Sequence, residues 1–231
     1  MSDEAITAIA GLVASFLSGL LGIGGGLVLT PLLLYLPPVV GGAAIPVKIV
    51  TGLTIVQAIS GSVLGVLRHR SYGNVSSRLV RLMGPPSAIA SLVGAFISRD
   101  TPDNVILIVF AILAFAGGVM LLLPVRPRDE LADEIRADPR LAIPIALVLG
   151  FFGGMVGIGG IAFIIAALIG KAATAQIDPP LAAVVFVSAL VASPMGAAVS
   201  VRTQPRALLA LLAAIVMLAA IRIAFTAVTG T

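Results

Sequence analysis

The chain has 231 residues, of which 59% are hydrophobic and only 10% charged, and its mean hydropathy is +1.18. Soluble domains are roughly 45–50% apolar and about 25% charged, so this composition excludes a water-soluble fold and predicts a protein that has the bilayer as its solvent. The net charge of +4 comes from basic residues in short connections without interleaved aromatics, which argues against a nucleic-acid partner. Cysteine is absent, which excludes disulfides and thiolate metal sites.

Apolar stretches between breakers and charges predict an all-α polytopic membrane protein, because several approach the roughly 20 residues that a helix needs to cross a bilayer. Asp3 and Glu4 precede the first stretch, where a signal peptide would carry positive charge, so we interpret that stretch as a membrane segment. The nine expected helical segments span residues 5–21, 25–39, 45–67, 79–98, 104–123, 141–156, 160–173, 180–201 and 206–228.

The stretch from Arg126 to Arg140 is the only strongly charged part of the sequence, and it must therefore lie in water. It divides the chain into two parts. We expect an N-terminal membrane repeat at residues 1–125, a charged connecting loop at 126–140 and a C-terminal membrane repeat at 141–231.

The two expected halves share a glycine-rich motif. A shift of 135 residues superimposes Gly19-x-x-Gly22-Ile23-Gly24-Gly25 on Gly154-x-x-Gly157-Ile158-Gly159-Gly160. The same shift aligns Val50 with Val185 and Gly61 with Gly196, so the predicted duplication includes the following segment. Nothing after Arg202 corresponds to residues 79–98, and we therefore expect the second half to be one helix shorter.

Each half begins with a pair of segments that are short for a full crossing. Each pair either returns to the side on which it starts or crosses the membrane once. If the pairs return, nine basic residues lie on one side of the membrane and four on the other. If they cross once, the division is ten against three, so the charge count does not decide between the two arrangements. We favour the return, because residues 5–39 at about 1.5 Å each far exceed a roughly 30 Å hydrocarbon core. It places the basic 68–81 loop in the cytoplasm.

Glycine clusters interrupt both pairs, although each glycine costs a helix roughly 1 kcal/mol relative to alanine. Unwound backbone at membrane depth is tolerated only where protein buries it or where it lines a water-filled cavity. Matched glycine-interrupted segments in two halves are typical of a transporter's substrate site. The glycines predicted to bind substrate are Gly22, Gly24, Gly25, Gly26, Gly157, Gly159 and Gly160.

The sign of the expected substrate follows from electrostatics. A helix that begins just after each glycine cluster directs free N–H groups and the positive end of its dipole toward the cluster, which favours an anion. None of the ten acidic residues lies inside a predicted apolar segment, which weakens a cation-transport hypothesis. Close helix packing is the alternative role for these glycines, and particularly for Gly19 and Gly154.

Polar residues on the segment after each pair offer neutral hydrogen bonds to an oxyanion. In the first half they recur at three-residue steps and so share one helix face. Hydrogen bonding between helices is an equal alternative for both groups. The residues are Thr51, Thr54, Gln57 and Ser60 in the first half and Ser188 and Ser193 in the second.

Cations near the segment ends are candidate charge partners for the anion. Lys48 begins the third segment and Lys171 ends the seventh, so either could attract an anion at a cavity mouth, although snorkelling to the interface is the favoured interpretation. Arg222 lies deeper in the last segment. It serves either the substrate or a contact between two copies in a homodimer, unless it too snorkels.

The motif G-x-x-G-I-G-G-G at residues 19–26, repeated as G-x-x-G-I-G-G at 154–160, resembles the sulfite exporter TauE/SafE family, also described as toluenesulfonate uptake permeases. The resemblance implies a multi-pass protein that moves sulfite, sulfoacetate, other sulfonates or organic acids across the bacterial cytoplasmic (inner) membrane. The second copy has Ile161 in place of Gly26 and Ala166 in place of Pro31, which argues against strict symmetry of the two sites.

The leading functional hypothesis is a secondary transporter, and specifically an exporter, with alternating access around the two glycine-broken pairs. An anion channel and a non-transporting structural membrane subunit are the alternatives. An enzyme is disfavoured, since the sequence has no cysteine, one histidine in a loop and no buried acid. We expect no cofactor, and a coupling proton or sodium ion would leave no sequence signature.

Overall fold

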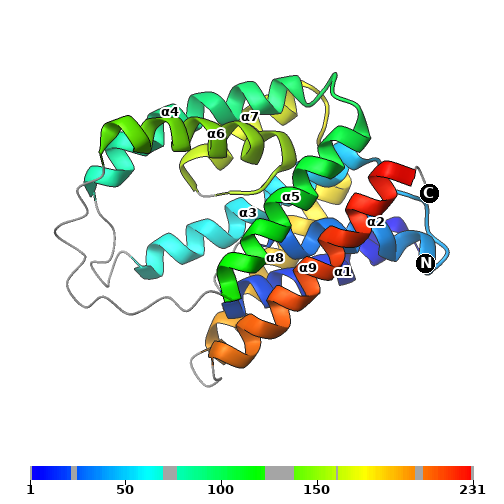
Figure 1. Cartoon of the computed structure of the whole chain (residues 1–231). Helices are drawn as coiled ribbons and strands as arrows, with labels where there is room; N and C mark the ends of the chain where they lie inside the picture. Colours follow the sequence, from blue (N-terminus) through cyan, green and yellow to red (C-terminus); the bar gives the residue numbers. More distant parts are fainter. Residues whose placement is uncertain are drawn as a thin grey trace.

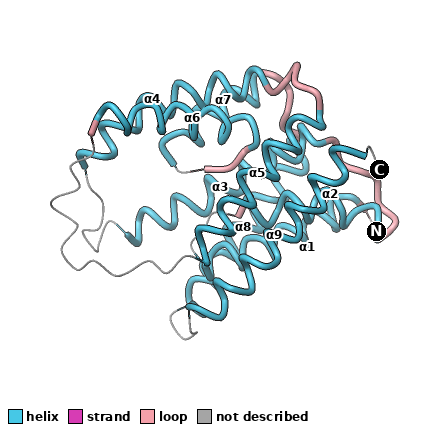
Figure 2. Tube along the Cα trace, in the orientation of Figure 1, coloured by secondary structure: helices cyan, strands magenta, loops and turns pink. Residues whose placement is uncertain are grey.

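The computed structural model describes residues 2–21, 25–69, 77–122, 138–159, 161–200 and 205–229, and these residues form helices without any strand (Figures 1 and 2). Every helix limit lies within two residues of the limit expected from the sequence, which confirms the all-α class. The helices are α1 (Asp3–Leu21), α2 (Gly26–Val39), α3 (Val47–His69), α4 (Ser77–Ile97), α5 (Asp103–Leu122), α6 (Pro139–Val156), α7 (Ile161–Ala173), α8 (Pro179–Ser200) and α9 (Pro205–Thr229).

The limits of α6 show how local sequence ends a helix. At its start, Asp138 Oδ1 accepts a hydrogen bond from the Arg140 N–H at 2.9 Å, and Pro139 occupies the first helical position. At its end, Gly157 adopts a left-handed conformation with φ of 85°, and its N–H donates to the Gly153 carbonyl oxygen at 2.8 Å. A capping acid and a left-handed glycine therefore define this helix.

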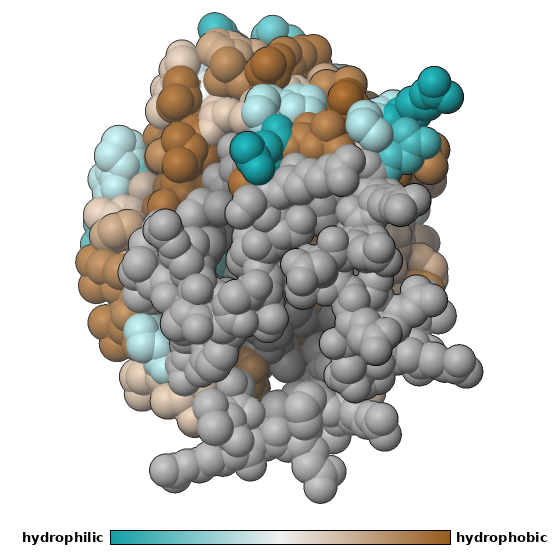
Figure 3. All heavy atoms as spheres, turned by 90° about the vertical axis from the view of Figure 1, so that its left-hand side faces the viewer, coloured by the Kyte–Doolittle hydropathy of each residue, from teal (hydrophilic) through white to brown (hydrophobic). Residues whose placement is uncertain are grey.

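The described helices that are long and apolar enough to cross a membrane are six: α1, α4, α5, α6, α8 and α9. Their outer faces carry large apolar side chains, such as Ile112, Leu218 and Phe225, each more than 60% exposed. Brown, apolar residues also dominate the described part of the surface in Figure 3. Such faces are stable against lipid acyl chains, so the protein is a multi-pass membrane protein.

The helices form two groups with α3 between them (Figure 1). One group contains α4, α6 and α7, and the other contains α1, α2, α5, α8 and α9. The larger buried core, which includes Leu29, Leu33 and Phe110, lies mostly in the second group and extends to α3 and to Met155 at the end of α6. A smaller core joins Ile55 of α3 to Ala95 of α4 and to α7. In this position α3 contacts α1, α2 and α5 of the first half of the sequence and α7 and α8 of the second.

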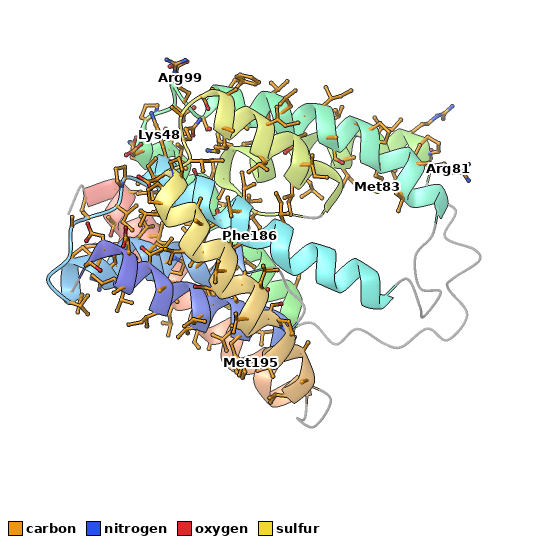
Figure 4. All side chains as sticks on the ribbon, turned by 180° about the vertical axis from the view of Figure 1, so that it is seen from behind. Lys48, Arg81, Met83, Arg99, Phe186 and Met195 are labelled. Carbon is orange, nitrogen blue, oxygen red and sulfur yellow. The ribbon has the colours of Figure 1, made fainter. Side chains whose placement is uncertain are left out.

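Several helix ends meet at one end of the molecule, here called the Lys48 end. The Ala43 N–H donates to Asp3 Oδ1 at 3.2 Å, which brings the start of α1 beside the end of α2. Lys48 Nζ donates to the carbonyl oxygen of Arg99, so the start of α3 meets the end of α4. Figure 4 shows Lys48 and Arg99 at this end and Arg81, near the start of α4, at the opposite one.

The two short pairs differ in topology. The first pair, α1 and α2, starts and ends at the Lys48 end, as expected. The second pair starts at the opposite end, because α6 runs parallel to α4, but Lys171 at the end of α7 contacts Met155 at the end of α6. The predicted return of the second pair is therefore wrong, and it crosses once. This topology corresponds to the ten-against-three division of basic residues.

Glycines bring α1 and α8 into backbone contact. A β-carbon built on Gly19 would overlap the carbonyl oxygen of Ser193, and one on Gly196 would overlap the carbonyl oxygen of Phe16. Small residues at such positions let helix backbones approach closely, and close van der Waals packing is a main source of helix association in lipid. The packing interpretation of Gly19 is therefore confirmed.

The same contacts recur between α6 and α4. Gly154 meets the carbonyl oxygen of Ser91, and Gly94 meets that of Phe151. Phe151 and Gly154 are the 135-residue equivalents of Phe16 and Gly19, which pack on α8. Packing therefore makes α4 the counterpart of α8, whereas the sequence shift pairs α3 with α8 and leaves residues 79–98 without a counterpart. Helix α3 is then the additional helix of the first half.

The α4–α6 contact generates a stability prediction. Replacing Gly154 with alanine should lower the unfolding temperature of the purified protein in detergent, because the new methyl group would overlap the Ser91 backbone and overpacking costs about 1–3 kcal/mol. The control is Gly117→Ala in α5, where the nearest atom, Leu27 Cδ1, lies 4.0 Å from the new β-carbon. Equal unfolding temperatures for the two variants would contradict the proposed packing.

Candidate functional site

A buried polar face of α3 forms the centre of the candidate site. Thr51, Thr54 and Gln57 are all at most 2% exposed. Thr51 Oγ1 donates to the Lys48 carbonyl oxygen and Thr54 Oγ1 donates to the Thr51 carbonyl oxygen, each at 2.8 Å. Both threonines thus satisfy their own hydroxyl protons within the helix and keep their oxygen lone pairs available as acceptors.

The first glycine cluster meets this face at Gln57. In the orientation that satisfies both ends of its amide, the Gln57 side chain donates to the Gly25 carbonyl oxygen at 3.1 Å and accepts from the Ser15 hydroxyl at 3.0 Å. A β-carbon at Gly25 would overlap the Gln57 amide. Helix α2 begins at the next residue, Gly26, in agreement with the expected helix start after the cluster.

The second glycine cluster meets the same face at the two threonines. Helix α6 ends at Val156 and α7 begins at Ile161, so the predicted helix break is confirmed. A β-carbon at Gly157 would overlap both the Thr51 carbonyl oxygen and Thr54 Oγ1. With φ of 85°, this position requires glycine for its conformation as well as for its contact. Gly159, with φ of 155°, continues the non-helical backbone.

The two clusters, far apart in sequence, contact each other. A β-carbon at Gly26 would lie 3.2 Å from the Gly157 carbonyl oxygen and 3.5 Å from Thr54 Cβ. The structure therefore brings six of the predicted residues into one place. We call this place the glycine junction: Gly25, Gly26 and Gly157, with Thr51, Thr54 and Gln57 of α3.

Other predicted residues lie elsewhere. Ser188 and Ser193 belong to the α1–α8 interface, where Ser188 Cβ lies 3.0 Å from a β-carbon built on Gly11, and Ser188 Oγ donates to the Ala8 carbonyl oxygen at 3.4 Å. Both serines therefore lie where they contact a neighbouring helix, and neither lies beside the glycine clusters. Outside the described residues lie Gly22, Gly24 and Gly160, and the side chain of Ser60.

The two predicted charge partners have separate surroundings. Lys48 is half-buried, and its amine donates to the carbonyl oxygen of Arg99, just after α4, at the Lys48 end. Arg222 is exposed on α9, and its guanidinium carbon lies 4.9 Å from the centre of the Tyr35 ring of α2, a cation–π contact. Neither contact joins these cations to the glycine junction. Among the described residues, no group of three histidines or acids could hold a metal ion.

Lys171 is the residue whose position the sequence interpretation got wrong. Its side chain is fully buried, so the expected snorkelling to the interface is wrong. Its amine donates at 2.8 Å to Thr51 Oγ1 and to Ser98 Oγ, at 2.7 Å to Gln176 Oε1 and at 3.0 Å to the Met155 carbonyl oxygen. The available signal was a lone cation inside an apolar segment, since such residues are costly and usually functional.

Comparison with known proteins gives one family. The family described as "Sulfite exporter TauE/SafE" matches residues 7–175, a range that includes the glycine junction and Lys171. No solved structure matches the chain.

Curated relatives are described as probable membrane transporter proteins. One, from Haemophilus influenzae, is 28% identical over 157 residues, which cover 67% of this chain and 58% of the relative. Another, probable membrane transporter protein YunE of Bacillus subtilis, is 28% identical over 182 residues, covering 67% of this chain and 63% of the relative. The chain thus spans about 60% of the length of these relatives.

The junction contact predicts unequal effects at two left-handed glycines. Alanine at Gly157 or at Gly41 should cost roughly 1–2 kcal/mol for the conformation, since φ is 85° and 80° respectively. Alanine at Gly157 also overlaps α3, whereas no atom lies within 4 Å of a β-carbon at Gly41. We therefore expect Gly157→Ala to lower the unfolding temperature well below that of Gly41→Ala. Similar unfolding temperatures for the two variants would show that α3 does not contact Gly157 closely.

Proposed function

Because the chain belongs to the TauE/SafE sulfite exporter family, we propose that it is a secondary transporter that exports a small sulfur-containing or organic anion, such as sulfite, sulfoacetate or another sulfonate. The printed descriptions of its relatives as probable membrane transporter proteins support transport. The proposal assigns the chain no catalytic reaction and no cofactor, and the coupling ion is a proton or sodium.

The observation that carries the proposal is the glycine junction. Two helix-break segments from the two expected membrane repeats, residues 1–125 and 141–231, meet against one polar helix face. Alternating access requires a site that both moving parts share, and broken helices commonly provide it near the bilayer midplane. The junction has this property, and we propose that its glycines form the substrate path, together with Thr51, Thr54 and Gln57.

The chemistry of the junction favours an anion. Helix α2 starts at Gly26 and α7 starts at Ile161, so the positive ends of both helix dipoles face the break segments. The buried polar residues around α3 are neutral or cationic: Thr51, Thr54, Gln57 and Lys171. No carboxylate is among the buried side chains of the described residues. The two threonine hydroxyls donate within α3, so the features here that stabilise an oxyanion are the two helix dipoles and the Lys171 amine.

Membrane orientation follows from the same topology. Helices α3 and α5 end, and α4, α6 and α9 begin, at the end opposite to Lys48. In the sequence, these helix termini, the end of α8 and the connections between them hold ten of the thirteen basic residues that the two topologies distribute. We propose that this end faces the cytoplasm of a bacterial inner membrane, because basic residues concentrate on the cytoplasmic side.

Flux measurements test the proposed transport. Proteoliposomes that contain the purified chain should move labelled sulfite faster than empty liposomes, with a rate that saturates as sulfite rises. A rate without saturation would favour a channel, and no flux of sulfite, sulfonates or carboxylates would overturn transport. Gly26→Ala should reduce flux, because its β-carbon would lie 3.2 Å from the Gly157 carbonyl oxygen, whereas Gly117→Ala in α5, with no atom nearer than 4.0 Å, should preserve it.

Cysteine labelling tests the orientation, since the chain has no native cysteine. Val39 at the end of α2 and Arg140 at the start of α6 are both exposed and lie at opposite ends. In intact bacterial cells, a membrane-impermeant maleimide should label Val39→Cys at once. It should label Arg140→Cys only after the membrane is permeabilised. The reverse pattern would invert the proposed orientation.

A further inference from the structure

The Lys171 amine is a buried cation for which the structure shows no acidic partner. It forms no ion pair in the part of the chain that the structure describes. Asp178, the carboxylate nearest in sequence, caps α8 instead, where its Oδ1 accepts from the Leu181 N–H at 3.0 Å. A charge without a counter-charge is costly in a protein interior.

We infer that the exported anion binds beside the Lys171 ammonium, on the side where Thr51 joins this amine to the glycine junction. The inference deepens the proposed function and rests on it. It adds a residue that neither the glycine motif nor the polar face of α3 identifies, and it assigns the positive charge that balances the substrate.

Hydrogen bonding around Lys171 fits the ammonium form. The Met155 carbonyl oxygen and Gln176 Oε1 can only accept. The Gln176 orientation is fixed, because its Nε2 donates to the Ala95 carbonyl oxygen at 3.2 Å and to Thr174 Oγ1 at 2.6 Å.

The two hydroxyl groups also act as acceptors. Thr51 Oγ1 uses its proton on the Lys48 carbonyl oxygen. Ser98 Oγ uses its proton on the Ala95 carbonyl oxygen at 2.7 Å or on Gln176 Oε1 at 3.0 Å. Four acceptors therefore surround the amine, and an ammonium supplies three protons where a neutral amine supplies two. These hydrogen bonds therefore favour the ammonium over the neutral amine, although burial without a counter-charge opposes it.

The arrangement of helix ends holds this charge in place without neutralising it. Lys171 reaches the C-terminal ends of α4, α6 and its own helix through Ser98, Met155 and Gln176. Carbonyl dipoles at these ends favour a cation. The contact to Thr51 instead belongs to the first turns of α3, where the dipole is positive. An anion on this side would meet the ammonium and the positive end of α3 together.

Thr51 also connects this position to the junction. Its hydroxyl accepts from Lys171, while its carbonyl oxygen lies against Gly157. An anionic oxygen that replaces the neutral Thr51 hydroxyl would keep the N–H bond and strengthen it, because charge-assisted hydrogen bonds are roughly twice as strong as neutral ones. A bound anion would thus meet the full positive charge of Lys171 beside Thr51, the residue that also contacts Gly157 of the second break segment.

A spectroscopic experiment on the unmodified chain tests the inference, because Lys48 and Lys171 are its only lysines. Protein labelled with ¹⁵N at the lysine ζ position should give two ammonium signals, assigned with Lys48→Arg. Sodium sulfite at constant ionic strength should shift the Lys171 signal saturably and leave the Lys48 signal in place. An unchanged Lys171 signal would overturn the inference, and this readout does not depend on a Lys171 variant that folds.

Binding by variants supplies the second arm. Lys171→Met should weaken sulfite binding on the order of 100-fold, since removing one partner of a buried charge pair is strongly unfavourable. Arg99→Met removes an exposed cation at the same end and should leave the affinity unchanged. Sulfite affinity equal to wild type in Lys171→Met would also overturn the inference.

The flux assay separates the two hypotheses. If wild type moves sulfite while the Lys171 signal does not respond, the proposed function stands and the inference fails. If the Lys171 signal shifts while no flux occurs, the chain binds an anion at Lys171, and the proposed transport fails.

Discussion

Backbone hydrogen bonding inside the bilayer is the constraint on which this structure depends. Lipid offers no partner for a free N–H or carbonyl group, so a helix can break at membrane depth only where protein supplies the missing contacts. Helix α3 supplies them here. Its Gln57 amide binds the Gly25 carbonyl oxygen, and its Thr51 and Thr54 lie directly against Gly157. At the second break the Gly157 and Ile158 N–H groups donate to the Gly153 carbonyl oxygen, and α3 buries the segment by contact.

Close backbone approach is the second element of the architecture. Glycines on α1 and α6 remove the side-chain spacing that would separate these helices from α8 and α4, and the two interfaces repeat the same contacts at Phe16 and Phe151. Tight parallel pairs on the two sides leave α3 between them. The two halves still differ in topology. Helix α2 returns to the end of the molecule where α1 starts, whereas α7 ends at the end opposite to the start of α6.

Much of the fold could be predicted from the sequence, because apolar run length and breakers act locally. The three-residue spacing of Thr51, Thr54 and Gln57 likewise predicted a shared face. Lys171 could not be placed in this way, since three of its four acceptors come from the ends of other helices, at Thr51, Ser98 and Met155. Ser188 and Ser193 were expected near the substrate but lie against α1. The spacing of residues along α8 does not reveal which helix packs on it.

The central position of α3 has a thermodynamic consequence. Since one rigid helix contacts both break segments, a shift of α3 that loosens its contact with Gly25 must also change its contact with Gly157. The two contacts are therefore energetically coupled, and the coupling is reciprocal: the first contact affects the second by the same free energy as the second affects the first. Substrate occupancy on one side of α3 would in this way be communicated to the opposite repeat without a separate relay of side chains.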